Sequence, residues 1–504
     1  MVCYSSGMNK QQRVVLVVSI LASFVAFLDG AIVNVALPAI QRDLGGGLAT
    51  QQWIVDAYLL TLGSLILIAG SLSDLLGRKK ILILGLLGFG ITSLLCAVAP
   101  NSESLIVFRA LQGIAGALLV PSSLALIIAT FSGAAQGKAI GTWTAWTGIS
   151  FIIGPLLGGI LVDWSSWRWI FAINVLPIVV TLYLLRRVEV KRERHDKTPV
   201  DGVGALLCAL GLGGPVFALI EQARYGWSSP LIYVPLIVGG LLLVSFLVYE
   251  KRAKQPMLPL SLFRNHNFSV GNVATLAIYA GLTVATFLTV LFLQQVSGYS
   301  ALAAGLSLLP VTLIMFALSP RFGALAGKYG PRLFMAIGPL LAGCGFLLML
   351  RVQADVDYWT QLFPAIILFG LGLSVTVAPL TAAILGDVQP DEAGIASAVN
   401  NAVLRVAGLV AVAVIGAVVA LQFSSAVEHN LKLSVPASVV VAAKQIPLQV
   451  SPPAPYQHDA AFRAVLARAS VSAFHAGIIA MASLMIAGGL ISFVGIKNPT
   501  RPTS

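Results

Sequence analysis

The chain has 504 residues, of which 58% are hydrophobic and 10% are charged, and its mean hydropathy is +0.92. A soluble protein carries about 25% charged residues, so this composition excludes a water-soluble globular protein and predicts that the lipid bilayer is its main solvent. The net charge of +12 does not indicate nucleic-acid binding, because the basic residues lie in short loops between apolar stretches and not in one patch.

Fourteen apolar segments are long enough to cross a bilayer, which requires roughly 20 residues per helix. We expect all of them to be helices, because an open sheet would leave backbone groups without hydrogen bonds in lipid. The expected spans are residues 14–37, 50–72, 80–98, 104–130, 137–161, 167–185, 202–220, 231–249, 268–295, 302–320, 332–350, 360–385, 393–421 and 471–495.

The loops predict the orientation of the chain. Lys and Arg are about three times more frequent in the loops that share a side with the N-terminus than in the opposite loops, and such loops face the cytoplasm. Both termini are therefore expected to be cytoplasmic.

A glycine-containing motif indicates an internal repeat. Residues 70–78, after the second expected span, have a weak echo in residues 323–332, after the tenth. This echo predicts six spans, two inserted spans and six more, with the two bundles of six sharing an ancestor. Two bundles around a central path are typical of a transporter.

The expected organisation follows from these segments. It comprises a cytoplasmic tail at 1–13, a six-helix bundle at 14–185, basic cytoplasmic linkers flanking two inserted helices at 186–267, a second six-helix bundle at 268–496 and a cytoplasmic tail at 497–504.

The second bundle also contains the longest extracytoplasmic loop, at 422–470. The proline spacing at 451–455 predicts no folded domain in this loop.

Charged residues inside the hydrocarbon layer are costly, so each is a functional hypothesis. Asp29 lies near the middle of the first span, and a buried carboxylate with an arginine such as Arg109 nearby can titrate near neutrality. We therefore expect Asp29 to carry the coupling proton. The alternative is a packing carboxylate that never changes its protonation.

Arg109 begins a polar face of the fourth span. Arg109, Gln112, Gly113 and Gly116 are spaced so that they share one side of a helix, which predicts that this side faces the bundle interior. The alternative is that Arg109 extends to the outer headgroups.

Besides Gln112, five further positions are expected on the substrate path. Trp53 and Asp56 lie in the second span, where Asp56 could share the proton or attract a cationic substrate, or remain a solvated charge near the outer mouth. Asn401 and Arg405 share a face of the thirteenth span, with Asn400 beside them, and packing through hydrogen bonds is as well supported there as substrate contact.

Two motifs predict conformational roles. The fifth span contains Gly154, Pro155, Gly158 and Gly159, where small residues permit close packing and the proline permits a bend.

The loop after the second span combines two glycines with an acid and a base. We expect Asp74 to hold Arg78, or to meet a helix N-terminus, as a cytoplasmic latch between Gly70 and Gly77. The alternative is a solvated loop charge.

Together these motifs resemble the major facilitator superfamily, and more narrowly its fourteen-span drug:proton antiporters. The resemblance extends from Leu28 to the last span and implies proton-driven export of lipophilic compounds. The matching segments are residues 28–38, 70–80, 109–113, 154–159 and 167–174.

Some positions depart from the family pattern. Ser150 stands where the antiporter motif usually repeats a glycine, and Gly30 and Ala31 replace a polar pair. The acid at Asp56 resembles members that expel quaternary ammonium cations, but the tenth and thirteenth spans lack the acids that help such pumps take divalent cations. We expect neutral or singly charged substrates.

The sequence therefore predicts a proton-coupled efflux antiporter in the cytoplasmic membrane of a bacterium, not an enzyme. The alternative is a proton-coupled symporter or exporter of a specific metabolite or lipid. The expected partners are a small lipophilic substrate, protons and membrane lipids, with a periplasmic adaptor at 422–470 as a weaker alternative. The scattered histidines and the lack of a phosphate-binding loop predict no metal, no cofactor and no use of ATP.

Overall fold

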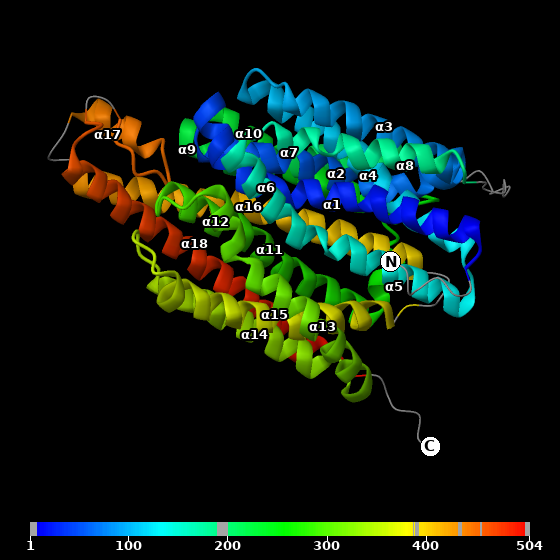
Figure 1. Cartoon of the computed structure of the whole chain (residues 1–504). Helices are drawn as coiled ribbons and strands as arrows, with labels where there is room; N and C mark the ends of the chain where they lie inside the picture. The colour runs from blue at the N-terminus through cyan, green and yellow to red at the C-terminus, as the bar shows by residue number, and fades with distance from the viewer. Residues whose placement is uncertain are drawn as a thin grey trace.

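The computed structural model describes residues 8–188, 200–386, 388, 393–431, 436–453 and 456–498. Within these ranges the regular structure is helical and no strand occurs (Figure 1). Thirteen helical stretches there are long and apolar enough to cross a membrane, and a shorter apolar stretch, Trp169–Leu185, stands at the sixth expected position. The predicted all-helical class is therefore confirmed.

The N-terminal part of the chain follows the expected order of spans, with two interruptions. The segment expected at 137–161 divides at Ile149, and the segment expected at 167–185 divides next to Asn174. Pro177 explains the second break, because its ring lacks an amide hydrogen and crowds the carbonyl four residues earlier. The helices are α1 Lys10–Leu44, α2 Leu48–Leu76, α3 Arg78–Ala97, α4 Ser102–Thr130, α5 Gly133–Gly148, α6 Ser150–Trp164, α7 Trp169–Ala172 and α8 Val175–Leu185.

The C-terminal part also contains an interrupted helical segment. Helix α12 ends before Leu308, and α13 begins directly after it, with Pro310 in its first turn. The helices are α11 His266–Gln295, α12 Ala301–Ser307, α13 Leu309–Tyr329, α14 Arg332–Leu348, η3 Met349–Arg351, η4 Tyr358–Leu362, α15 Phe363–Gly386, α16 Ala393–Leu431, α17 Ala437–Lys444 and α18 Ala460–Gly495.

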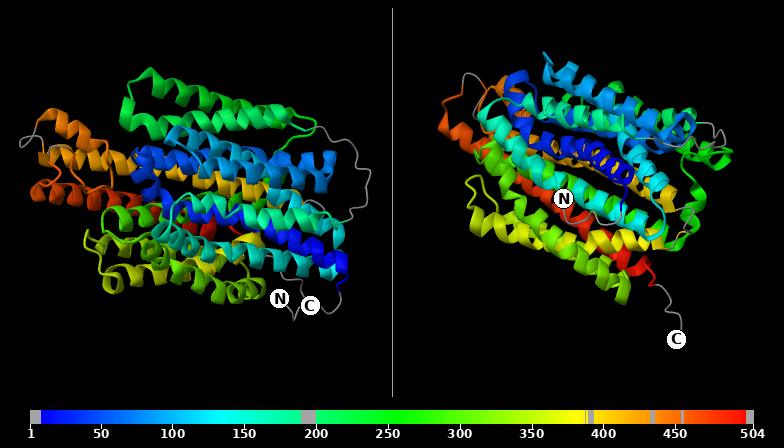
Figure 2. Two further views of the ribbon diagram at one scale, coloured as in Figure 1. Left: turned by 45° about the horizontal axis from the view of Figure 1, so that its top comes forward. Right: turned by 45° about the vertical axis from the view of Figure 1, so that its right-hand side comes forward.

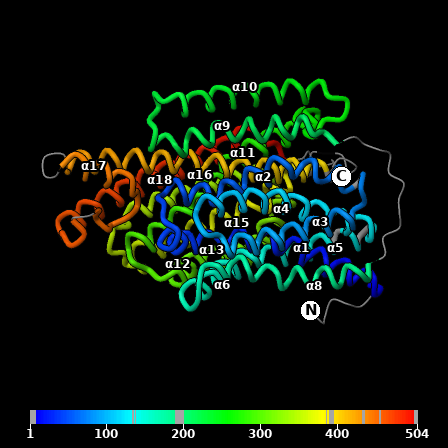
Figure 3. Tube along the Cα trace, turned by 90° about the horizontal axis from the view of Figure 1, so that it is seen from above, coloured from blue at the N-terminus to red at the C-terminus, as the bar shows by residue number. Residues whose placement is uncertain are grey.

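Between these two parts lies an inserted helical pair, α9 (Gly202–Tyr225) and α10 (Pro230–Arg252), followed by the short helix η2 (Leu260–Arg264). The pair lies on the flank of the molecule, with α10 outermost (Figures 2 and 3). Helix α9 packs against both α2 and α16, whereas α10 packs mainly on α9. The insert therefore contacts one helix of the N-terminal part, α2, and one helix of the C-terminal part, α16.

The segment 422–470 is more ordered than its prolines suggest. Helix α16 continues to Leu431, α17 forms after Pro436, and α18 already begins at Ala460. Alanine-rich runs flank the prolines and favour helix, and Pro436 precedes a helix start, where its missing amide hydrogen costs nothing. The expectation that this segment contains no folded domain stays a prediction.

Two glycines support the internal repeat. Gly77 ends α2 with φ of 99°, and Gly330 ends α13 with φ of 90°. The backbone amide of Gly77 donates to the Ser73 carbonyl (3.1 Å), and that of Gly330 donates to the Ala326 carbonyl (2.8 Å). This left-handed conformation favours glycine, so the same turn links corresponding helices of the two parts.

Candidate functional site

A buried polar network joins α1 to α4. Arg109 Nη1 lies 2.5 Å from Asp29 Oδ2, and the Gln112 side-chain amide donates to Asp29 Oδ1 at 3.0 Å. The exposed fractions of the Asp29 and Arg109 side chains are 0% and 1%. Two opposite charges without access to water require close contact, and the predicted pairing of these residues is present.

The remaining donors of Arg109 also find partners inside the bundle. Its Nε donates to the Ile54 carbonyl of α2 at 3.1 Å, and its guanidinium lies 4.3 Å from the centre of the Tyr58 ring. The interpretation that Arg109 extends to the headgroups is excluded in this structure. The side of α4 that carries Arg109, Gln112 and the glycines faces α1 and α2, as its spacing predicts.

Two members of the network are additions to the sequence-based site. Asn174, between α7 and α8, donates to Asp29 Oδ1 at 3.1 Å, and Ser93 of α3 accepts from Gln112 at 2.9 Å. Both are fully buried. A polar residue within an otherwise apolar segment was the available signal, but only tertiary packing shows which polar residues meet.

Asp56 is the second buried acid. Its side chain has no exposure, and neither carboxylate oxygen has a hydrogen-bond partner among the described residues. One turn earlier, Gln52 donates to the Val412 carbonyl of α16 at 2.7 Å, and further along the same face Gly63 abuts Arg405 of α16. Asp56 therefore faces the junction of α2 with α16, and the interpretation as a solvated charge does not fit this structure.

Trp53, which the sequence placed on the substrate path, contacts the insert instead. Its indole nitrogen donates to Glu221 of α9 at 2.9 Å, and its ring packs against Phe217 with centroids 6.0 Å apart. Residues one position apart are rotated by about 100° around a helix, so Trp53 and Gln52 face different neighbours. Trp53 therefore joins α2 to α9, and its expected place on the substrate path stays a prediction.

Arg405 of α16 reaches α1 across the interface between the two parts of the chain. Its guanidinium carbon lies 5.2 Å from the centre of the Phe27 ring, and its buried Nε has no hydrogen-bond partner in the described part of the chain. Among the described residues, no carboxylate forms an ion pair with Arg405. This interface therefore contains an unneutralised positive charge.

The two asparagines beside Arg405 make packing contacts. The Asn400 amide donates to Asn272 and Thr275 of α11, both at 3.1 Å, and the Asn401 amide donates to the Ser397 carbonyl within its own helix at 2.9 Å. Of the two alternatives that the sequence left open, these bonds favour packing.

The glycine and proline motif lies where α6 meets two other helices. A Cβ atom on Gly154 would stand 2.7 Å from the Cβ of Ala31 in α1, and one on Gly158 would stand 2.7 Å from Ile32 Cγ1. Gly159 instead abuts the backbone of Leu302 in α12. The motif therefore permits close approach of α6 both to α1 and to the C-terminal part of the chain.

The cytoplasmic motif is described in part. Gly77 forms the turn between α2 and α3, while no atom lies within 4 Å of a Cβ atom built on Gly70. The side chain of Asp74 lies outside the described residues, so the expected pairing of Asp74 with Arg78 stays a prediction.

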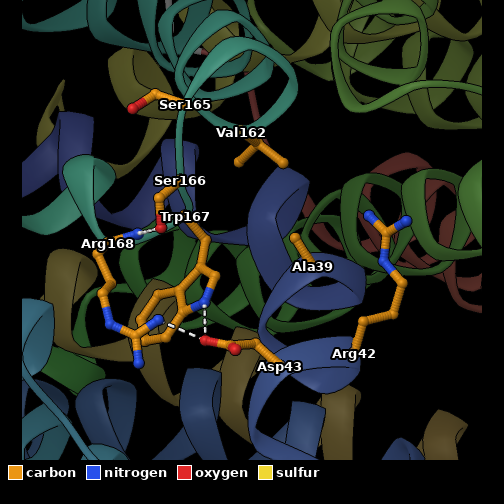
Figure 4. A pocket seen from close by; sticks show the side chains of 8 residues that line it. All are labelled: Ala39, Arg42, Asp43, Val162, Ser165, Ser166, Trp167 and Arg168. Carbon is orange, nitrogen blue, oxygen red and sulfur yellow. Dashed lines mark hydrogen bonds and ion pairs between the residues drawn. The ribbon is translucent and has the colours of Figure 1, made fainter.

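Trp167 and Arg168 of the motif at 167–174 line a pocket of about 410 Å³, which lies where α1 and α6 end (Figure 4). Asp43 of α1 accepts a hydrogen bond from the Trp167 indole at 2.9 Å and forms an ion pair with Arg168. These bonds stay within the N-terminal part. The lining residues are Ala39, Arg42, Asp43, Val162, Ser165, Ser166, Trp167 and Arg168.

Comparison with known structures agrees with this architecture. A bacterial homologue of the human lysosomal transporter Spinster, in an inward-facing and unoccupied conformation, superimposes with a TM-score of 0.71 at 14% identity, covering 98% of this chain and 100% of that chain. A D-xylose–proton symporter gives a TM-score of 0.62 at 14% identity, covering 97% and 99%.

Sequence comparison finds relatives at higher identity. The puromycin resistance protein of Streptomyces alboniger is 36% identical over 80% of this chain and 81% of its own length. The methylenomycin A resistance protein of Bacillus subtilis is 36% identical over 81% and 88%, and a multidrug transporter protein of the same species is 33% identical over 81% and 76%.

The family model of the major facilitator superfamily matches residues 19–412. Together with the apolar helices and the resistance-protein relatives, this match makes the protein a multi-pass membrane transporter. The chain belongs to the major facilitator superfamily.

Proposed function

We propose that this transporter is a proton-coupled antiporter that exports lipophilic, neutral or singly charged toxic compounds across the cytoplasmic membrane. The observation that carries the proposal is the fully buried Asp29–Arg109 pair, because a buried ion pair at membrane depth marks a functional site by default. The proposal keeps fourteen spans in a 6 + 2 + 6 order, with both termini in the cytoplasm.

The proton step follows from the bonds around Asp29. Its carboxylate accepts hydrogen bonds from Arg109, Gln112 and Asn174, and therefore joins α1, α4 and the α7–α8 junction. A proton on Asp29 removes the charge that attracts Arg109 and weakens the link between α1 and α4. The membrane potential supplies about 2.3 kcal/mol per elementary charge and 100 mV to drive such a cycle.

The direction of opening is inferred from contacts between the two parts of the chain. Asp163 of α6 accepts hydrogen bonds from the first two backbone amides of α12, and Gln294 of α11 donates to the Val35 carbonyl of α1 at 2.9 Å. These contacts lie at the end predicted to be extracytoplasmic. We infer that the structure represents the inward-facing state of an alternating-access cycle.

The class of substrate rests on the relatives and on charge. The names of the related proteins refer to puromycin, methylenomycin A and multidrug resistance, which supports export of lipophilic compounds. The unneutralised positive charge of Arg405 at the interface disfavours a substrate with two positive charges, because it repels both charges of that substrate.

The test is uptake of ethidium into inverted membrane vesicles that carry an inside-acid proton gradient. The parent and the Asp29→Asn variant are compared at equal amounts of protein in the membrane, with Asp43→Asn as a matched control. Asp43 lies on the same helix, but its carboxylate is half exposed and bonds only to the 167–168 corner. We expect the parent and the control to accumulate ethidium, and Asp29→Asn to lose accumulation.

Other outcomes separate the alternatives. A protonophore must abolish accumulation by the parent, otherwise the proposed coupling is wrong. Full activity of Asp29→Asn moves coupling to Asp56 or elsewhere. Uptake of a metabolite with protons in right-side-out vesicles, without ethidium transport in inverted vesicles, favours the symporter alternative.

A further inference from the structure

A second pair of carboxyl groups, one buried and one partly buried, lies far from Asp29, at the base of the inserted helices. Asp201 precedes α9 and caps it, since its Oδ1 accepts the backbone amide of Gly204 at 2.8 Å. Glu250 lies near the end of α10, and its exposed fraction is 2%. The N-cap residue of one inserted helix therefore meets the last turn of the other.

Each of these two residues has one oxygen without a partner. Asp201 Oδ2 and Glu250 Oε1 both lack a hydrogen-bond partner among the described residues. A Cβ atom on the buried Gly204 would stand 2.5 Å from Glu250 Oε1 and 2.6 Å from Asp201 Oδ2. The two unpartnered oxygens therefore converge on a position in α9 that has no side chain, Gly204.

The surroundings do not neutralise this pair. Tyr249 lies beside Asp201, and Cys208 of α9 lies close to Glu250, but neither carries a positive charge. The nearby bases Lys251, Arg252 and Lys254 are exposed. The ion pairs among the described residues involve other side chains, so within the described part of the chain no cation offsets these two carboxyl groups.

Two adjacent carboxylates that are removed from water and lack a cation cannot both stay ionised at low cost, and they share a proton instead. The carboxyl group that holds the proton donates a hydrogen bond to the oxygen of the other carboxylate. Both oxygens that are otherwise unpaired then have a partner.

The second oxygen of Glu250 binds the linker between α10 and α11. Glu250 Oε2 accepts the backbone amide of Leu258 at 2.9 Å, in the linker at 253–265 that joins α10 to α11. Met257 of this linker is buried with Cys208 in one apolar cluster, while Leu262 is buried with Phe268 in the other. The linker therefore connects the insert to the first helix of the C-terminal bundle.

We propose that Asp201 and Glu250 hold a single proton between them and act as a pH-sensitive clamp that fixes the 253–265 linker to the inserted helices. When the proton leaves, the two carboxylates repel each other and Glu250 no longer holds Leu258 in place. The clamp is thus closed below the titration point of the pair and opens as pH rises through it. This gives the insert a regulatory role that does not require Asp29.

The test is hydrogen–deuterium exchange of the full chain in lipid nanodiscs between pH 6 and pH 9, corrected for the intrinsic pH dependence of exchange. In the parent, we expect exchange of the peptide that contains Leu258 to quicken by up to about tenfold per pH unit as the pH rises toward the titration point of the closed pair, and to level off above it. The reason is that opening releases a proton only while the closed pair still holds one. In Glu250→Gln, the amide replaces the protonated carboxyl, so protection should no longer depend on pH.

Asp201→Asn tests the other half of the pair and should also remove the pH dependence. Glu221→Gln is the matched control, because Glu221 lies at the opposite end of α9 and bonds to Trp53; it should respond as the parent does. The same pH response in the parent, Glu250→Gln and Asp201→Asn would overturn the proposal. The measurement needs neither substrate nor gradient, so its result is independent of the proposed transport activity.

Discussion

The carboxylate of Asp163, near the end of α6, accepts a 2.8 Å hydrogen bond from the backbone amide of Leu302 in the first turn of α12. The other carboxylate oxygen accepts the amide of Ala301 at 3.0 Å. A carboxylate is favourable at a helix N-terminus, where amides lack intrahelical partners. These bonds link the N-terminal and C-terminal parts directly, beside the glycines of the antiporter motif.

Asp163→Ala should therefore shift the transporter away from the state in which this end is closed. Hydrogen bonds to a charged group contribute about 1.5–3 kcal/mol each, so we expect at least a tenfold change in the ratio of the two states. Spin labels at the exposed positions Val98 and Trp359, in a chain without native cysteines, would report a larger population of long distances.

The control for this prediction is Asp43→Ala. Asp43 lies at the same end, but its partners Trp167 and Arg168 belong to the N-terminal part. Its loss should leave the distance distribution unchanged. Equal shifts in both variants would mean that general destabilisation, and not the loss of a link between the two parts, causes the change.

Removal of Arg109 should destabilise the protein as well as stop transport. In Arg109→Gln, Asp29 would remain fully buried without its counter-charge, which costs about 3–5 kcal/mol. The double variant Asp29→Asn/Arg109→Gln should recover much of the lost stability, because no unpaired charge remains. Thermal unfolding in detergent measures this coupling, and strictly additive losses would contradict it.

The sequence was sufficient to predict the features that depend on local spacing. The apolar segments, the face of α4 that carries Arg109 and Gln112, and the burial of Asp29 all follow from helical periodicity and from the cost of charge in lipid. The interruption near Asn174 is not evident from overall hydropathy, because Pro177 lies within an apolar run. The helices within 422–470 are not evident either, because the proline spacing there draws attention away from the alanine-rich runs.

The contacts between distant helices could not be predicted in the same way. Asn174 lies 145 positions from Asp29, and Asp163 lies 139 positions from Leu302. Their meeting depends on which helices become neighbours, and that depends on packing across the whole chain. The contact of Trp53 with α9 could not be predicted for the same reason, since a repeat of two six-helix bundles does not indicate where the inserted helices pack.

Gly158→Ala should impair packing between α6 and α1. The added Cβ would stand 2.7 Å from Ile32 Cγ1 and 3.2 Å from the Ile32 carbonyl oxygen, so one of the helices must shift. Overpacking of this kind costs about 1–3 kcal/mol, and we expect a lower unfolding temperature and slower transport.

Gly148→Ala is the matched control, because no atom lies within 4 Å of its added Cβ. Alanine favours helix over glycine by about 1 kcal/mol, so this variant should be as stable as the parent or slightly more so. If both variants lose the same stability, helix flexibility and not close packing explains the motif.

The last prediction concerns the charge of the substrate. Arg405 places a positive charge at the interface between α16 and α1, without an ion-pair partner among the described residues. At roughly 8 Å and an effective dielectric constant of about 20, two unit charges interact by about 2 kcal/mol. Arg405→Gln should therefore lower the KM for a monocationic dye by about thirtyfold and permit transport of a bis-quaternary dication, while the KM for a neutral substrate stays nearly unchanged.

Arg351→Gln is the control for this change of net charge, because Arg351 is exposed at one end of η3 and lies outside the α1–α16 interface. It should leave all three substrates unaffected. If Arg405→Gln changes the KM for neutral and cationic substrates by the same factor, Arg405 acts through packing against Phe27. Strong efflux of the dication by the parent would show that the charge of Arg405 is screened from the substrate path.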